Sequence, residues 1–127
     1  MKFFFDNCLS YRYADMLRAL DVDVVALRSQ FSESIKDIEL FEKIRASDSV
    51  FVSCDHRQTT RELEAKGLKE CGLTAIYFGP FWSKMTFWPQ AAWLINHWPK
   101  IDGFASSVVQ GTFAEIKRNG KAMMFTV

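Results

Sequence analysis

The stretch "KFFFDN", residues 2–7, sets three phenylalanines directly before an acid and an amide. Consecutive aromatic residues suit a strand that is buried on both faces, so Lys2–Phe5 predicts a short core strand. Asp6 and Asn7 are unsuited to such a core, because burying a carboxylate without partners is expensive. The strand therefore ends on a charged group, and the fold must place something beside it.

Strand and helix signals alternate along the rest of the chain. Further strands are predicted at Asp21–Leu27, Ser49–Cys54 and Leu73–Phe78. Amphipathic helices are predicted around residues 13–20, 34–44, 59–72 and 89–98. Such alternation is typical of parallel strands joined by right-handed crossovers. Two final strands, 112–117 and 121–126, flank Asn119-Gly120, a sequence that favours a hairpin turn. We expect one α/β domain over residues 1–127, with a mainly parallel sheet and a C-terminal hairpin.

Helix boundaries are predicted from cap residues. Ser34 is a candidate N-cap of the second helix, and Thr59 with Glu62 has the spacing of a capping box for the third. Gly67 or Gly72 is expected to end that third helix, since glycine adopts the left-handed conformation of a helix C-terminus.

Composition indicates no strong overall charge bias. The formal charge is +1, with 49% hydrophobic and 15% aromatic residues. Residues 1–64 carry 9 Lys/Arg and 12 Asp/Glu, whereas residues 65–127 carry 7 and 3. An acidic half beside a basic half suits a cation site next to a surface for a polyanion. Three cysteines without CxxC or CxxH spacing, no signal peptide and no apolar run of about 20 residues predict a cytoplasmic protein without zinc or a membrane span.

Acidic residues follow two of the predicted strands. Asp6 follows the first strand and Asp55 the third. If the strand order is 2-1-3-4, these strands are neighbours about 4.8 Å apart, and their carboxylates meet at the edge where open parallel sheets bind ligands. Asp37 shares the apolar stripe of its predicted helix and is expected to face the same cleft. Three acids around one cleft repel each other unless a cation is bound, and Mg²⁺ or Mn²⁺ prefers such oxygen ligands. The ion would activate water for attack on a phosphodiester.

Each acid also has a purely structural interpretation. Asp6 could close its strand with an Asx-turn, and Asp55 could be a loop acid before a helix. Asp37 could be the capping-box partner of Ser34. The separate signals are weak, and their shared placement strengthens them together.

Two blocks of sequence resemble the PIN-like domains of small bacterial proteins and of VapC-type toxins. The blocks are "FFFDNCLSYRYADML" (3–17) and "KDIELFEKIRASDSVFVSCD" (36–55). Those domains begin with a hydrophobic strand, Asp-Asn-x-Leu-Ser and a helix; a later helix starts with an acid, has Glu two residues on, and leads to a strand ending Thr-x-Asp. The matching residues here are Asp6, Asn7, Leu9, Ser10, Asp37, Glu39, Ser53 and Asp55. The resemblance covers roughly residues 2–78.

This resemblance implies a three-layer α/β/α fold and a metal-dependent ribonuclease, often the toxin of a type II toxin–antitoxin pair. It implies that Asp6, Asp37 and Asp55 bind Mg²⁺ or Mn²⁺ and carry catalysis. Ser53 would orient the Asp55 carboxylate, and Asn7 would be a polar neighbour of Asp6.

Arg57 departs from the family pattern, and Glu39 has a second interpretation. Relatives often carry an acid two residues after the last motif Asp, where this chain has Arg57. Arg57 makes the cleft less acidic, which disfavours a second metal ion; it could contact the scissile phosphate or be a solvated arginine at a helix start. Glu39 stands at a motif position, but its spacing predicts an exposed i, i+4 ion pair with Lys43.

The stretch "FGPFWSKMTFWPQAAWLINHW" (78–98) is rich in aromatic residues. One predicted core stripe consists of Ala91, Leu94, Ile95 and Trp98. Trp93 lies on another face with His97 and Lys100; such aromatic residues could join the core, form a dimer or antitoxin interface, or stack on bases of RNA. The expected phosphate-facing charges are Lys84, Lys100, Lys117, Arg118 and Lys121.

The leading prediction is a metal-dependent ribonuclease acting on RNA, held by a protein antitoxin and expected to dimerise. A second candidate is a non-catalytic receiver-like domain, since receivers also place acids after strands one and three. Receivers carry adjacent acids after strand one, however, where Asn7 follows Asp6, and they have no use for Asp37. A degenerate PIN-like domain that binds RNA or a partner without cleavage is the third candidate.

Overall fold

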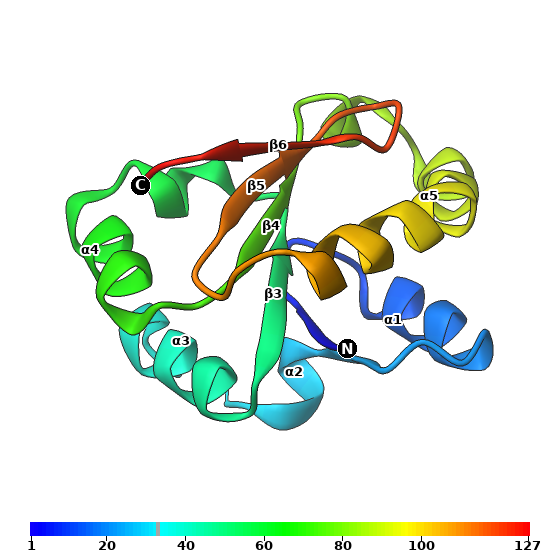
Figure 1. Cartoon of the computed structure of the whole chain (residues 1–127). Helices are drawn as coiled ribbons and strands as arrows, with labels where there is room; N and C mark the ends of the chain where they lie inside the picture. Colours follow the sequence, from blue (N-terminus) through cyan, green and yellow to red (C-terminus); the bar gives the residue numbers. More distant parts are fainter. Residues whose placement is uncertain (33) are drawn as a thin grey trace.

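The computed structural model describes residues 1–32 and 34–127, which form a six-stranded sheet between two layers of helices (Figure 1). The strands are β1 (Lys2–Phe5), β2 (Val24–Ala26), β3 (Ser49–Ser53), β4 (Ala75–Phe78), β5 (Phe113–Ile116) and β6 (Ala122–Phe125). The helices are α1 (Tyr11–Ala19), α2 (Leu27–Gln30), α3 (Asp37–Ala46), α4 (Glu62–Cys71) and α5 (Phe87–Ser107), with short 3-10 helices η1 (His56–Thr59) and η2 (Trp82–Lys84). The predicted three-layer α/β/α fold is confirmed.

The strand order is β2-β1-β3-β4-β5-β6, with β1 to β5 parallel and β6 antiparallel to β5. The predicted order of the first four strands is therefore correct. The C-terminal hairpin is also present, and it extends the sheet at one edge. Gly120 in its turn has φ +82°, a conformation that glycine adopts without strain. Because β1 lies between β2 and β3, the loops after these three strands meet at one edge of the sheet.

The three phenylalanines of β1 explain why this strand nucleates two cores. Phe3 and Phe5 pack against α1 and α5, whereas Phe4 packs in the opposite layer with α3. All three are at most 3% exposed. Side chains of a strand alternate between faces, so a strand that is buried on both sides has no polar position. The first polar residue, Asp6, comes where the strand ends.

Three of the four tryptophans lie in the layer between the sheet and α5. Trp82, Trp93 and Trp98 are buried, and the Trp93 indole N–H donates to the Arg118 carbonyl oxygen (2.8 Å). The alternatives of a Trp93 interface or a Trp93 base-stacking surface are therefore wrong, and Trp93 belongs to the core. Ile95, predicted as part of the buried stripe, is 46% exposed because α5 turns it away from the sheet.

The predicted helix N-caps differ from those observed. Helix α3 begins at Asp37 after Lys36, and α4 begins after Arg61; neither N-cap makes a side-chain capping bond. The capping roles predicted for Ser34 and for Thr59 with Glu62 are therefore wrong, because η1 occupies the expected start of the third helix. Gly72 ends α4 with φ +70°, as one of the two predicted alternatives required. No helix within residues 1–32 and 34–127 is long and apolar enough to cross a membrane.

Candidate active site

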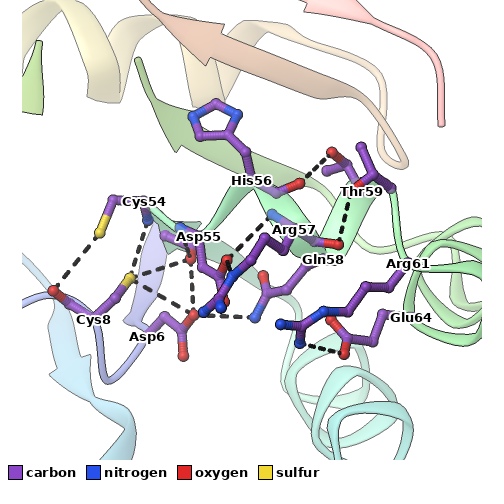
Figure 2. A network of polar contacts seen from close by, with 12 residues as sticks. Asp6, Cys8, Cys54, Asp55, His56, Arg57, Gln58, Thr59, Arg61 and Glu64 are labelled. Atoms are coloured by element: carbon purple, nitrogen blue, oxygen red, sulfur yellow. Dashed lines mark hydrogen bonds and ion pairs between the residues drawn. The ribbon is translucent and has the colours of Figure 1, made fainter. Parts of the chain in front are cut away.

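Asp6 is held at the carboxyl end of β1 by four hydrogen bonds to its carboxylate, one of which comes from the Cys8 thiol to Oδ2 (3.8 Å). Its Oδ1 accepts from the Asn7 backbone amide (2.8 Å). Its Oδ2 accepts from the Ser53 hydroxyl (2.8 Å) and from the Gln58 side-chain amide (3.1 Å). Figure 2 shows the Asp6 carboxylate between Cys8 and Gln58. With 9% of the residue exposed, these donors replace the water that a buried carboxylate needs and fix its orientation.

Gln58 links Asp6 to the core, and no sequence pattern marked it as a site residue. This residue lies in η1, is 4% exposed, and its Oε1 accepts a hydrogen bond from the Tyr77 hydroxyl (3.2 Å). Burial raises the pKa of Tyr77, and the nearby Asp6 charge raises it further, so the phenol keeps its proton and donates. The chain Tyr77–Gln58–Asp6 therefore fixes the amide with its N–H group toward the carboxylate. The "HRQTT" run around Gln58 reads as an exposed loop, which hid this contact.

Ser53, at the end of β3, contacts a different acid from the one predicted. Its hydroxyl donates to Asp6 Oδ2 and accepts from the Asp55 backbone amide (3.0 Å). The expected role of orienting the Asp55 carboxylate is therefore wrong. The reason is local: Asp55 turns into η1 as its N-cap, whereas Ser53 still points along the sheet edge toward the neighbouring strand.

Asp55 is bound by Arg57 on both carboxylate oxygens. Arg57 Nε donates to Oδ1 (2.8 Å) and a terminal Arg57 nitrogen donates to Oδ2 (3.2 Å), while the Arg57 backbone amide also donates to Oδ1 (3.2 Å). These hydrogen bonds from Arg57 lower the pKa of Asp55. Arg57 therefore acts as an internal counter-ion for an acid that the sequence assigned to a metal.

Asp37 reaches the same region from the first turn of α3. Burial raises its pKa, and the charges of Glu64, Asp6 and Asp55 raise it further. The influence of these charges means that the side chains from β1, α3, η1 and α4 share one electrostatic site. The charges of Asp6 and Asp55 therefore reach Asp37 near the carboxyl edge of the sheet, and the grouping of these three acids around one metal ion stays a prediction.

Glu64 on α4 is a fourth acid that the motif reading missed. Its Oε1 accepts from Arg61 (3.0 Å), and its Oε2 is buried without a hydrogen-bond partner among the described residues. A hollow of about 630 Å³ between α3 and α4 has Asp37 and Glu64 in its wall. The signal that could have found Glu64 is its position four residues before the buried Leu68, on the same helix face.

These acids match a hard divalent cation in chemistry but not yet in arrangement. The buried Glu64 Oε2 has no hydrogen-bond partner among the described residues, and the charge of Glu64 adds to the burial that raises the pKa of Asp37. Across residues 1–32 and 34–127, however, no three histidine, cysteine or acidic side chains stand close enough to hold one ion together. Asp55 would have to leave Arg57 to join the others. The oxygen donors therefore suit Mg²⁺ or Mn²⁺ in their chemistry, while Arg57 occupies the Asp55 carboxylate.

Two cysteines lie beside Asp6. The Cys8 sulfur is 3.4 Å from the Ser53 hydroxyl and accepts from the Cys54 backbone amide (3.1 Å), and the Cys54 thiol contacts the Cys8 carbonyl oxygen (3.7 Å). Hydrogen bonding by the Cys54 side chain lowers the pKa of Cys8, and the same contact raises that of Cys54. The thiols close one side of the site.

The other predicted site residues lie around the margin. Asn7 is exposed next to Asp6, as expected of a polar neighbour. Glu39 is exposed on α3 and lies 3.9 Å from Lys43, the predicted ion pair. Lys84 is exposed on η2, in the segment that follows the carboxyl end of β4.

A family model described as a PIN like domain matches residues 1–79. The match spans more than half of the 127 residues and contains β1 to β4 with all four acids, Arg57 and Gln58. No curated protein and no solved structure gives a significant match. The matched segment holds the site, and α5 with the hairpin lies outside it. The fold, the site at the carboxyl edge and the family match agree, and the chain belongs to the PIN-like domain family.

Proposed function

We propose that this protein is a metal-dependent ribonuclease whose site is formed by Asp6, Asp37 and Asp55. The observation that carries the proposal is that Asp6 and Asp55 follow neighbouring parallel strands, β1 and β3, and that their charges reach Asp37 on α3 and raise its pKa. PIN-like domains are commonly nucleases, and the family match covers every one of these residues. Mutual repulsion between carboxylates is unfavourable unless a cation resolves it.

Each acid has a distinct part in this proposal. Asp6 is the fixed ligand, because hydrogen bonds from Ser53 and Gln58 leave its carboxylate only one orientation. Asp37 contributes from α3. Glu64 is a further candidate ligand through its unpartnered oxygen. Asp55 becomes available once Arg57 releases it. A bound Mg²⁺ or Mn²⁺ supplies Lewis-acid activation of water and neutralises charge on the phosphate.

Arg57 has two partners in the proposed cycle. Without substrate and metal, its guanidinium neutralises Asp55. If Asp55 were to hold a cation, the same planar group would be free to bind the scissile phosphate, for which its geometry is well suited. Lys84 would add charge along the substrate path. Arg57 thus replaces the acid that relatives carry without leaving the site unbalanced.

The proposed substrate is RNA, and the proposed biological role is that of a type II toxin controlled by a protein antitoxin. The family supports nuclease activity in general, and the specific role is our extension of it. Trp82 and Trp93 give no support to an aromatic antitoxin or dimer interface, since both are buried. A partner would have to bind elsewhere on the surface.

A degenerate PIN-like binding domain is the second candidate. It is favoured by the Arg57–Asp55 ion pair and by the lack of a preassembled metal cluster among the described side chains. A receiver-like role is less well supported. Lys117 follows β5 at the carboxyl edge of the sheet, where a receiver has its lysine, but Lys117 pairs with Glu115. Arg57 in turn binds Asp55, the acid that would accept the phosphoryl group.

Calorimetric titration of Mn²⁺ with a parallel assay of single-stranded RNA degradation tests the proposal. Wild type should bind the metal and cleave, and Asp6→Asn should lose both. Glu70→Gln is the matched control, because this acid is exposed, pairs with Lys66 (3.9 Å) and lies in the last turn of α4, away from the hollow that Asp37 and Glu64 line. Metal binding without cleavage would favour the degenerate domain. No binding by the wild type would reject the proposed site.

A further inference from the structure

A hollow of about 440 Å³ opens at the carboxyl end of β1, beside the proposed cleavage site. Its lining residues are Asn7, Leu9, Ser10, Tyr11 and Arg28. Asn7 connects the hollow to the site, because its backbone amide donates to Asp6 Oδ1 (2.8 Å). The hollow therefore begins one residue from the carboxylate that we place at the centre of catalysis.

Tyr11 and Arg28 form the wall between this hollow and a second one. The Arg28 guanidinium carbon lies 5.0 Å from the centroid of the Tyr11 ring, and the Tyr11 residue is 46% exposed. The second hollow, of about 240 Å³, shares both residues in its lining. An exposed aromatic ring beneath a guanidinium is a surface on which a further planar group can stack.

The position of Arg28 also answers an electrostatic need. Phosphates are repelled by the acids around Asp6, so a bound strand needs positive charge on both sides of them. Arg28 follows β2 and Arg57 follows β3, and β1 with Asp6 lies between these strands. The sheet order therefore places Asp6 between the two strands that lead to these arginines, and those two strands are about 10 Å apart.

We propose that Tyr11 and Arg28 form a nucleotide subsite that binds an unpaired base and its phosphate next to the cleaved bond. Tyr11 stacks on the base, and Arg28 contacts the phosphate. The faces of bases are exposed in single strands and hidden in duplexes, so the subsite selects single-stranded RNA. This inference rests on the proposed function, since it takes its orientation from Asp6.

Fluorescence anisotropy of a labelled single-stranded RNA of about 12 nucleotides, with EDTA present, measures binding apart from cleavage. Tyr11→Ala should raise the Kd roughly 5- to 100-fold, the range of one lost base stack. Arg28→Gln should also weaken binding, and it should reduce the slope of log K against log salt by about 0.7, the effect of one phosphate contact. Tyr11→Ala should leave that slope unchanged.

Lys43→Gln is the matched control. Lys43 also lies over an aromatic ring, that of the half-buried Phe31 (5.9 Å to the ring centroid). Lys43 is in the last turn of α3, away from the hollow. It should bind RNA as wild type does. Wild-type affinity in both Tyr11→Ala and Arg28→Gln, equal affinity of the wild type for a duplex, or no RNA binding by the wild type would each overturn the subsite.

The same assay separates this inference from the proposed nuclease. Asp6→Asn should bind RNA at least as tightly as wild type, because an acid that repels phosphate is removed. Binding that depends on Tyr11 in a wild type that never cleaves would retain the subsite and reject the nuclease. Metal-dependent cleavage with RNA affinity that is indifferent to Tyr11 and Arg28 would do the reverse.

Discussion

The Arg57 guanidinium donates hydrogen bonds to both carboxylate oxygens of Asp55, to Oδ1 at 2.8 Å and to Oδ2 at 3.2 Å. The acid expected to bind metal therefore already has a cationic partner. A metal ion must compete with this guanidinium. The role of Arg57, which stands where relatives carry an acid, can therefore be tested by substitution.

Replacing Arg57 with glutamine should raise the affinity for Mn²⁺ several-fold, because Asp55 is then free and a nearby positive charge is gone. Arg57→Lys separates the two causes: it keeps the charge but loses the planar fork. Calorimetry should place Arg57→Lys near Arg57→Gln if the fork is what blocks the metal. Unchanged affinity in Arg57→Gln would show that Asp55 takes no part in metal binding.

Asp6→Asn should abolish cleavage and also destabilise the fold. The new amide nitrogen must lie beside the Asn7 amide or beside the Ser53 and Gln58 donors, so one hydrogen bond becomes a contact between donors. We expect a loss of about 1–3 kcal/mol in the free energy of unfolding by urea. Asp55→Asn is the control, because Asp55 pairs with the exposed Arg57. Loss of this ion pair should change the free energy of unfolding by less than about 1 kcal/mol. Equal stability of Asp6→Asn and wild type would contradict the buried network.

Gln58→Met should destabilise the protein by about 1–3 kcal/mol, because the buried Tyr77 hydroxyl loses its acceptor and Asp6 loses a donor. Urea unfolding of Gln58→Met, Tyr77→Phe and the double variant forms a cycle. The double variant should be more stable than Gln58→Met, since no hydroxyl is left unpaired. Strict additivity would mean that the two side chains do not interact. Cleavage and metal affinity should both decrease in Gln58→Met, because Asp6 loses its fixed orientation.

Asp37 should make the metal-free protein less stable as pH rises above about 4. Burial and neighbouring charges raise its pKa in the folded state, so the folded protein binds this proton more tightly than the unfolded chain does. Stability is then lost as pH rises from the unfolded value, about 3.9, through the folded one. Asp37→Asn should be more stable than wild type at pH 7 in EDTA, and the gain should vanish toward pH 4. Urea unfolding across this range measures it, and a constant difference would refute the assignment.

Trp93→Ala should lower the free energy of unfolding by about 3–5 kcal/mol, as expected for removing a buried tryptophan. It also leaves the Arg118 carbonyl without its donor. Trp88→Ala, on the same helix but 79% exposed, should change stability by no more than about 0.5 kcal/mol. Similar effects of both substitutions on thermal unfolding would contradict the burial of Trp93.

The backbone arrangement was predictable from the sequence because it rests on period and strand order. The run Phe3–Phe5 requires burial on both faces, and Asp6 and Asp55 follow strands that were correctly expected to be neighbours, β1 and β3. The side-chain pairings were not predictable. Gln58 and Arg57 make their contacts from η1, a single 3-10 turn for which the sequence has no clear periodic signal.

Glu64 shows a different limit of sequence reasoning. Its helix was expected, but the motif directed attention to the position of Arg57 for a fourth acid. Which acid faces a site depends on how α4 packs against α3, and that packing sets the rotation of the whole helix. The environment of Trp93 was ambiguous for the same reason, because helical spacing alone does not show which element this side chain packs against.

The uneven distribution of tryptophan makes the two halves of the molecule optically distinct. Helices α1 and α5 lie on one side of the sheet, and α3 and α4 lie on the other (Figure 1). Trp82, Trp93 and Trp98 belong to the core on the α1 and α5 side, and the opposite core is built from other apolar residues. Intrinsic fluorescence therefore reports on one layer, whereas far-ultraviolet circular dichroism reports on both. A denaturation in which the dichroism changes before the fluorescence would reveal that the layer bearing Asp37 and Glu64 opens on its own.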